Sequence, residues 1–404
     1  MKIALIHYAA QPVVGGVESV IGHQARLMTE NGHQVCIVAG RGDQMDARIP
    51  FVRLPLADSR HEQVLHLKSD LDAGRVPKEF DSFVERLESQ LLEAVRDADW
   101  LIAHNVCSLN KNLALTAALK RLSETHARPR LILWHHDLAW VTPRYQNELH
   151  DGYPWNLLRT DWPRAAQVTV SETRRRELSE LLKVDFGRIL VVPNGIDAAQ
   201  FLKLESQTER LIGQLDMFSA APLILLPVRI TPRKNIELAL RVLAELHLKF
   251  KRARLVVTGP LGPHNPANAE YFERLVALRR ELNLGGAVHF LAELGSQALP
   301  DEVIADLYRM ADVLFLPSRE EGFGIPILEG GLRGIPIFCA DIPPLRELGG
   351  SQANYFSPDA DPQKVAAQLS AWLEASPIFT LRERIRDEFT WGQVYARHIE
   401  PLLA

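Results

Sequence analysis

The sequence predicts an α/β protein made of two Rossmann-like domains, each built on a parallel sheet. A strand, a glycine loop, a helix and a second strand open the chain, and the same order returns about 220 residues later. The length of 404 residues, at roughly 150 residues per domain, allows two to three domains. With 47% hydrophobic and 24% charged residues, the composition is that of an ordinary globular protein.

The first β-α-β unit is read from changes in the hydrophobic period. Its parts are an apolar, β-prone run at Lys2–Tyr8, a break at Gly15-Gly16, helical apolar spacing over Val17–Asn31 and a buried strand at Gln34–Val38. This order predicts parallel pairing of the two strands. Further strands of this domain are expected at Trp100–Ala103, Arg130–Trp134 and Gln167–Val170.

The segment 59–97 is charged and helix-prone, with a break expected at Gly74 and Pro77, and is interpreted as a helical insertion in the first domain. The strand Ile189–Val192 ends in the turn sequence Pro193-Asn194-Gly195-Ile196-Asp197. Because this turn closes the strand, it predicts an N-terminal domain over residues 1–197.

The second domain, expected over residues 198–385, repeats the alternation. Its first unit is a strand at Leu223–Val228, a helix at Asn235–Phe250 and a strand at Arg254–Thr258. The alternation continues with Ala287–Leu291, Pro300–Ala311 and Val313–Leu316 as strand, helix and strand. Residues 386–404 are predicted to return to the N-terminal domain as a terminal helix, since apolar residues recur at helical spacing from Trp391 to Leu402.

Composition excludes several classes of function. Lys plus Arg number 46 against 50 Asp plus Glu, a net charge of −4, so the surface as a whole has no drive toward nucleic acid. Cys36, Cys107 and Cys339 have no spacing typical of zinc ligands or a redox pair, which fits a reducing cytoplasm. The longest apolar run, 220–228, is about half of what a bilayer requires. We expect a cytoplasmic protein without a transmembrane segment, leaving weak peripheral membrane contact and the oligomeric state open.

The densest chemical signal is the segment from Ser318 to Glu329. A strand ends just before it, Gly322 and Gly324 permit positive φ, and a proline suits the first turn of the following helix. Helix N-terminal amides of this kind bind phosphate, while Glu321 and Glu329 can accept hydrogen bonds from sugar hydroxyls. The alternative is that both glutamates are solvated acids that support the helix dipole.

Two cations form the second signal. Arg229 and Lys234 lie in the loop after the first strand of the second domain, at the sheet edge where the Glu321 loop also lies. Each could attract a diphosphate by about 4 kcal/mol at 4 Å for an effective dielectric constant of 20. The alternative is that Arg233-Lys234 only caps a loop.

The third signal is Trp134-His135-His136-Asp137 at the end of a predicted strand. One of these histidines could donate to a substrate hydroxyl, with Asp137 as the orienting group, or both could be structural. The pair Gly15-Gly16 could let a phosphate approach the first helix, although it is not a dinucleotide fingerprint. Asp70-Leu71-Asp72 is interpreted as structural, and no metal site is predicted.

Together these motifs resemble the retaining glycosyltransferases of family 4, also called group 1, whose members have the GT-B fold of two domains facing an interdomain cleft. The resemblance spans nearly the whole chain, and its most specific part is the pair of glutamates around Gly-Phe-Gly-Ile-Pro. The motifs that carry it are Gly15-Gly16-Val17-Glu18, His136-Asp137, Val192–Asp197, Arg229 with Lys234, Glu321–Glu329, Gly334-Ile335-Pro336 and the terminal helix.

The resemblance implies roles for the matching residues. Arg229 and Lys234 would bind the donor diphosphate and act in catalysis, and Glu329 would hold the ribose. His136 would meet a hydroxyl of the transferred sugar near the reacting carbon. The remaining implied donor contacts are Gly16, Gly259, Glu321, Gly322, Phe323, Gly324 and Ile325, with Glu321 also counted as catalytic.

The implied reaction moves a hexose from a nucleoside-diphosphate sugar, of the UDP-glucose or GDP-mannose type, to an acceptor hydroxyl with retention. No metal or other cofactor is expected, because Arg and Lys take the place of a cation. The N-terminal domain would face the acceptor, through Gly15, His104, Asn105, Asn110 and Tyr145.

Three departures from the family pattern alter the expected pocket. Val228 and Asn235 stand where glycine is frequent, and Gly330-Gly331 follow Glu329, where they should weaken the helix by about 1 kcal/mol each. The alternatives are another GT-B enzyme, such as a sugar-nucleotide epimerase or a phosphorylase-like protein, or a catalytically silent sugar-nucleotide-binding protein.

Overall fold

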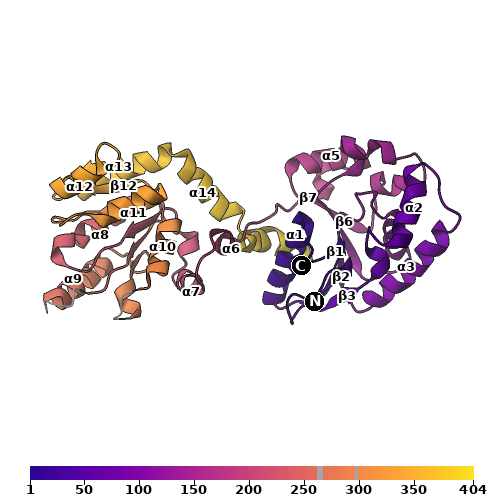
Figure 1. The fold of residues 1–404 in the computed structure, drawn as a ribbon, viewed down its shortest axis with the longest axis horizontal. Helices are drawn as coiled ribbons and strands as arrows, with labels where there is room; N and C mark the ends of the chain where they lie inside the picture. Colours follow the sequence, from indigo (N-terminus) through magenta and orange to yellow (C-terminus); the bar gives the residue numbers. More distant parts are fainter. Residues whose placement is uncertain (262–266, 296–298) are drawn as a thin grey trace. The chain divides into compact units, whose positions relative to one another are not determined.

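The computed structural model describes residues 1–261, 267–295 and 299–404, which form two compact α/β units (Figure 1). Unit 1 comprises Met1–Gly195 and Trp391–Ala404, and unit 2 comprises Ile196–Thr390. Each unit contains one sheet in which every neighbouring pair of described strands is parallel. The predicted pair of Rossmann-like parallel-sheet domains is therefore confirmed.

Unit 1 has the strand order β3-β2-β1-β4-β5-β6-β7, in which β1 is a central strand. Register places Lys2 beside Gln34 and Ile3 beside Trp100. The helices and strands of this unit are β1 (Lys2–Ala9), α1 (Gly16–Glu30), β2 (Gln34–Arg41), β3 (Phe51–Arg53), α2 (Glu62–Asp72), α3 (Phe80–Ala94), β4 (Trp100–His104), α4 (Leu113–Thr125), β5 (Arg130–His135), β6 (Ala165–Thr169), α5 (Glu172–Leu182), β7 (Ile189–Val191), α15 (Trp391–Val394) and α16 (Glu400–Leu403).

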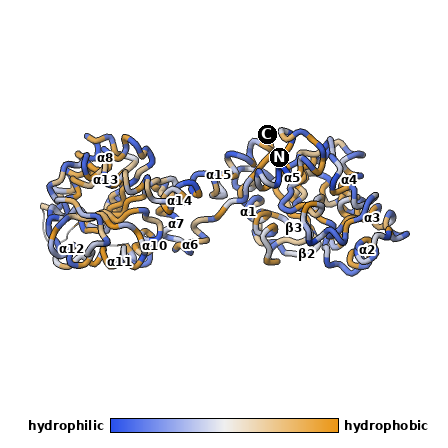
Figure 2. Tube along the Cα trace, turned by 90° about the horizontal axis from the view of Figure 1, so that it is seen from above, coloured by the Kyte–Doolittle hydropathy of each residue, from blue (hydrophilic) through white to orange (hydrophobic). Residues whose placement is uncertain are grey.

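Both faces of the unit 1 sheet are covered by helices. Alternate residues of β1 point to opposite faces, so Ile6 packs in the core formed with α2, α3 and α4, while Leu5 packs in the core formed with α1 and the C-terminal segment. This burial on two faces explains why β1 is almost continuously apolar. Figure 2 shows hydrophobic segments inside each unit.

The region predicted as a helical insertion consists of α2 and α3, separated by a break at residues 73–79. The returning C-terminal segment begins at Trp391, five residues after the expected 386, and includes a π-helical turn at Tyr395–Ile399. Trp391 and Leu403 are buried in the unit 1 core, whereas Leu402 is only partly buried. The π turn holds more residues than an α turn, which shifts the buried stripe.

Unit 2 has the order β10-β9-β8-β11-β12-β13 among its described strands. Strands β12 and β13 were not expected from the sequence, and β13 is only three residues long and begins with a polar asparagine. The described helices and strands of this unit are α6 (Ala198–Leu202), α7 (Ser206–Gln214), β8 (Leu223–Leu226), α8 (Ile236–Leu246), β9 (Arg254–Val257), α9 (Ala267–Glu281), β10 (Val288–Phe290), α10 (Asp301–Met310), β11 (Val313–Leu316), α11 (Ile325–Arg333), β12 (Ile337–Ala340), α12 (Pro343–Gly349), β13 (Asn354–Phe356), α13 (Pro362–Ala375) and α14 (Pro377–Glu388).

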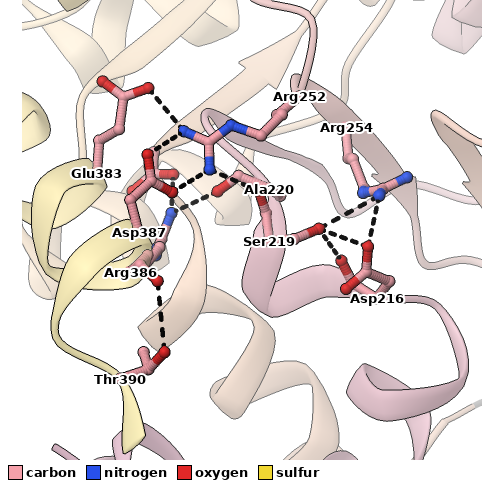
Figure 3. A network of polar contacts seen from close by, with 10 residues as sticks. Asp216, Ser219, Ala220, Arg252, Arg254, Glu383, Arg386, Asp387 and Thr390 are labelled. Carbon is pink, nitrogen blue, oxygen red and sulfur yellow. Dashed lines mark hydrogen bonds and ion pairs between the residues drawn. The ribbon is translucent and has the colours of Figure 1, made fainter. Parts of the chain in front are cut away.

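Helix α14 is attached to unit 2 mainly by charged side chains. Arg386 donates to Oδ2 of Asp312 at 2.6 Å, and Asp312 is only 4% exposed. Figure 3 shows Arg252 between Glu383, at 3.1 Å, and Asp387. Because its contacts are polar, α14 has a weak apolar stripe, and its end at Glu388 could not be read from hydrophobic spacing.

Candidate functional site

The strand order of unit 2 changes direction between β8 and β11. From β8 the sheet continues to β9 and β10, and from β11 it continues the other way to β12 and β13. In open parallel sheets, ligands bind beyond the carboxyl ends of the strands at such a switch point. The loop after β8 carries Arg229 and Lys234, and the loop after β11 carries Glu321. Strand order therefore brings the two strongest sequence signals to the same place.

Lys234 and Glu321, 87 residues apart in sequence, form an ion pair at this point. The Lys234 ammonium lies 2.5 Å from Oε1 of Glu321, and their side chains are 10% and 11% exposed. Ser318 donates to the same oxygen at 2.7 Å. A charge this buried needs a partner, so each group holds the other at the switch point. Ser318 was quoted in the sequence motif without a role.

Asn235 explains one departure from the family pattern. Its φ of +51° lies in the left-handed region, which glycine adopts most easily and which asparagine tolerates. Its side-chain amide donates to the carbonyl oxygens of Pro317, at 3.1 Å, and Pro358, at 2.9 Å. Asn235 thus replaces the expected glycine and also ties the loop after β8 to the loop after β11.

Arg229 presents an exposed side chain from the loop after β8, the loop that also carries Lys234. The residue is exposed, and within the described chain its side chain has no hydrogen-bond or ion-pair partner. The backbone behind it is held tightly by Gly259, which donates to the Val228 carbonyl at 3.1 Å. A Cβ at position 259 would overlap the Val228 oxygen and come within 2.6 Å of the Arg229 Cα. Glycine is therefore required at 259 on steric grounds.

The loop that contains Glu321 leads into α11. Gly324 is the residue before the helix, with a φ of +105°, and a Cβ there would lie 2.7 Å from Cδ2 of Leu345. Pro326 occupies the first turn, as predicted. Gly322 is exposed, and Phe323 and Ile325 are 56% and 58% exposed. The loop thus presents both backbone and apolar side chains to solvent beside Lys234.

Glu329 lies one turn into α11 and is fixed by Tyr308 of α10. The tyrosine hydroxyl donates to Oε2 of Glu329 at 2.5 Å, while Tyr308 itself is 3% exposed. Burial and the nearby carboxylate together raise the pKa of Tyr308 far above its ordinary value, so the phenol stays protonated. Tyr308 was missed because it falls on the buried stripe of α10, where an aromatic residue indicates core.

The sheet of unit 1 also has a switch point, between β1 and β4. Gly15 precedes α1 in extended conformation, and Glu18 occupies the space that a Cβ at 15 would take. Gly16 has no atom within 4 Å of an ideal Cβ position, so nothing in the fold demands glycine there. The expected approach of a phosphate to Gly16 stays a prediction.

Four histidines gather at the carboxyl ends of β1, β4 and β5. His7 contacts the carbonyl oxygen of His104 through Nδ1 at 2.7 Å, and Nδ1 of His104 lies 3.2 Å from Nε2 of His136. His135 is buried and bonds Gln167 at 2.8 Å. Burial lowers the pKa of His7 to about 3 and those of His135 and His136 to about 4. His136, the one partly exposed residue of the adjacent pair, is thus neutral at pH 7.

One sequence expectation about this region was wrong, and another stays a prediction. Asp137 does not orient His136: it lies 3.8 Å from Arg174, and His104 contacts the ring instead. His104 and Asn105 are buried, at 0% and 3% exposed, because β4 ends in the middle of the sheet, where neighbouring loops cover the side chains that follow it. Their contact with an acceptor stays a prediction.

Asn110 and Tyr145, the other residues expected on the acceptor side, also lie in unit 1. Asn110 is buried and donates to Glu148 at 2.7 Å, and Lys68 of α2 donates to the same carboxylate at 2.9 Å. Tyr145 is partly buried beneath the Arg144 guanidinium, 4.7 Å from its ring centre. Contact of either residue with an acceptor stays a prediction.

The described residues contain no group of three or more His, Cys, Asp or Glu side chains placed to hold a metal ion. No helix among them combines the length and the apolar character needed to cross a bilayer.

Two families match consecutive parts of the chain. Residues 14–200 match "Glycosyltransferase Family 4", and residues 207–388 match "Glycosyl transferases group 1". The first match falls almost entirely in unit 1 and the second lies within unit 2.

Individual relatives agree with these matches. The chain is 24% identical to mannosylglucosylglycerate synthase of Petrotoga mobilis, over 85% of this chain and 83% of the relative. It is 24% identical to the MMP alpha-(1->4)-mannosyltransferase of Mycolicibacterium hassiacum, over 99% and 97% of the two chains. It is 30% identical to D-inositol 3-phosphate glycosyltransferase of Kineococcus radiotolerans, over 58% and 57%. The chain therefore belongs to the family 4, or group 1, glycosyltransferases and has the two parallel-sheet domains of the GT-B fold.

Proposed function

We propose that this glycosyltransferase moves a hexose from a nucleoside-diphosphate sugar to an acceptor hydroxyl, with retention at the anomeric carbon and without a bound metal or other cofactor. The observation that supports this proposal is the meeting of Arg229, Lys234, Glu321 and the start of α11 at the switch point of unit 2. This set offers two cations, a carboxylate and helix N-terminal amides to one ligand.

Arg229 and Lys234 have different parts in binding the diphosphate. Glu321 already neutralises Lys234 in the buried pair, so the net positive charge of the site comes from exposed Arg229. A phosphate near both cations would gain about 4 kcal/mol from each at 4 Å and an effective dielectric constant of 20, before the Glu321 charge is subtracted. These cations would also stabilise the leaving diphosphate, the task that a metal ion performs elsewhere.

The two glutamates would hold the sugar hydroxyls of the donor. Tyr308 takes one oxygen of Glu329 and leaves Oε1 available to accept from the ribose. Glu321, with backbone from Gly322 to Ile325, would contact the transferred hexose. Oε1 of Glu321 accepts from both Lys234 and Ser318, so its Oε2 is the atom that remains available.

In the chemical step, the bond between the anomeric carbon and the diphosphate oxygen breaks, and the acceptor oxygen bonds the same face of that carbon. The acceptor proton passes to the leaving phosphate oxygen, so no protein nucleophile is required. His136 of unit 1 would meet a hydroxyl of the transferred sugar. As a neutral ring it supplies one hydrogen-bond donor and no charge.

A screen of nucleotide sugars tests the proposal. GDP-mannose and UDP-glucose come first, because the names of two relatives contain mannosyl and one of these names also contains glucosyl. Mass spectrometry would detect binding, and release of nucleoside diphosphate with candidate hydroxyl acceptors would measure transfer. Activity is expected to persist in EDTA, and the product anomer, read by NMR, to match the donor. A chain that binds none of the nucleotide sugars and releases no nucleotide would contradict the proposal.

A further inference from the structure

Two consecutive residues at the end of β4, His104 and Asn105, hold His136 by separate contacts. Asn105, in left-handed conformation with a φ of +57°, accepts through Oδ1 from the amides of His136, at 2.7 Å, and Asp137, at 3.1 Å. The preceding residue, His104, contacts the His136 ring. One residue therefore fixes the backbone and its neighbour fixes the side chain.

The surroundings of the His104 ring fix its position and its charge. It is 0% exposed and stacks on Trp134, with ring centres 5.2 Å apart and planes at 29°. Burial keeps its pKa well below the ordinary value, so the ring is neutral and carries one proton. Its Nδ1 faces Nε2 of His136 at 3.2 Å, and within the described chain its Nε2 has no partner.

Only two arrangements of the proton fit this geometry. If His104 carries it on Nδ1, it donates to Nε2 of His136, and only a bare acceptor nitrogen stays unpaired. If His104 carries it on Nε2, a buried N–H stays unpaired and His136 must be the donor. Unpaired buried N–H groups are rarer than unpaired acceptors, which favours the first arrangement.

We propose that His104 is a positioning residue: it donates through Nδ1 to Nε2 of His136 and fixes His136 as the Nδ1–H tautomer, a donor toward the substrate. The importance of this tautomer for transfer rests on the proposed function. Within the described chain, Nδ1 of His136 has no hydrogen-bond partner, so its proton is available to a sugar hydroxyl. The opposite tautomer would present a bare acceptor at the same position.

NMR of the whole protein labelled with ¹⁵N-histidine tests the tautomer directly. Two-bond proton–nitrogen correlations distinguish Nδ1–H from Nε2–H rings, and the spectrum of His136→Phe assigns the signals. A neutral His136 protonated on Nδ1 at pH 7 is expected. A His136 ring protonated on Nε2, or on both nitrogens, would overturn the proposal. This result is independent of activity, so it stands even if no nucleotide sugar is turned over.

Kinetics with a donor found by the screen test the positioning role. His104→Phe keeps a stacked ring but removes both nitrogens, so kcat/KM should fall about tenfold, as for one lost hydrogen bond. His104→Asn, which retains an N–H near the position of Nδ1, should recover kcat/KM to within about threefold of the parent. In a His136→Phe background, His104→Phe should have no further effect. An equal loss in both backgrounds would show that His104 acts on folding rather than through His136.

Discussion

The two cations of unit 2 differ in their surroundings. Lys234 is almost buried against Glu321, while Arg229 is exposed and unpaired in the described chain. Loss of Lys234 therefore removes a charge from the proposed diphosphate site and also leaves a carboxylate, 11% exposed, without its counter-ion. These two consequences can be measured separately.

Lys234→Ala is expected to lower turnover by about 100-fold or more, the size of effect seen when a transition-state charge contact is lost. It should also lower the free energy of unfolding by about 3 kcal/mol, because a buried pair is broken on one side. Steady-state kinetics and urea denaturation measure the two effects.

The matched control is Lys249→Ala, which breaks an ion pair with Glu374 whose side chains are 59% and 44% exposed. This variant should keep its turnover and lose no more than about 1 kcal/mol of stability. Unchanged kinetics in a folded Lys234→Ala protein would contradict the diphosphate role.

Glu329→Ala is expected to weaken binding of a nucleoside diphosphate by about tenfold or more, because hydrogen bonds to the charged carboxylate are lost. Calorimetric titration of the parent and the variant measures the change. Glu320→Ala is the control and should bind normally, because Glu320 is an exposed loop residue whose side chain has no hydrogen bond or ion pair in the described chain. Equal affinity of Glu329→Ala and the parent would reject the ribose assignment.

At the scale of elements, α11 shows that adjacent glycines can have opposite effects. The sequence suggested that Gly330 and Gly331 both weaken the helix. A Cβ at 330 would lie 2.7 Å from Cδ2 of Leu314 on β11, whereas a Cβ at 331 meets no atom within 4 Å. Gly330 therefore lets the helix approach the sheet, and only Gly331 is a helix residue without a packing reason.

The pair Gly330→Ala and Gly331→Ala tests this difference. Gly331→Ala should raise the free energy of unfolding by about 1 kcal/mol, since alanine restricts the unfolded chain and favours helix. Gly330→Ala should lower it by about 1–3 kcal/mol, because the added methyl overpacks against β11. Denaturant midpoints measure both. Changes of the same sign in the two variants would show that the contact with Leu314 does not decide the effect.

For the molecule as a whole, the loss of folding stability at acid pH should be largest in unit 1. His7, His135 and His136 have pKa values of about 3, 4 and 4 in the fold, below the ordinary 6.5. Their neutral forms contribute full stability above pH 6.5. As the pH falls from 6.5 toward 4, the unfolded chain binds protons that the folded chain does not, and stability is lost.

The expected loss is roughly 2 kcal/mol per histidine at pH 5 relative to pH 7. Urea denaturation at several pH values measures the total, and hydrogen exchange locates it in β1, β4 and β5. His135→Gln should reduce the pH slope, and His66→Gln, at a side chain 71% exposed, should not. A stability that is flat between pH 7 and 5 would contradict the buried neutral histidines.

Much of the fold could be predicted because it depends on local patterns. Strands such as Val313–Leu316 are short apolar runs between turn signals, and the structure has the predicted bounds. Strands β12 and β13 and the end of α14 were not predicted. Strand β13 is three residues long with a polar first residue, and the contacts of α14 are mainly polar, so neither has a clear hydrophobic period. In the site, Tyr308 and His104 acquire their contacts from residues 21 and 32 positions away, which no local pattern reports.

By itself, the sequence determined the two α/β halves and the chemical groups that the proposed donor would meet. These follow from hydrophobic period, turn residues and residue type, which are local properties. Only the tertiary structure decided that Lys234 meets Glu321, that Tyr308 holds Glu329, and that His104 rather than Asp137 holds His136. The physical reason is strand order: pairing between distant strands determines which loops share a sheet edge, and burial there determines which polar groups must find partners.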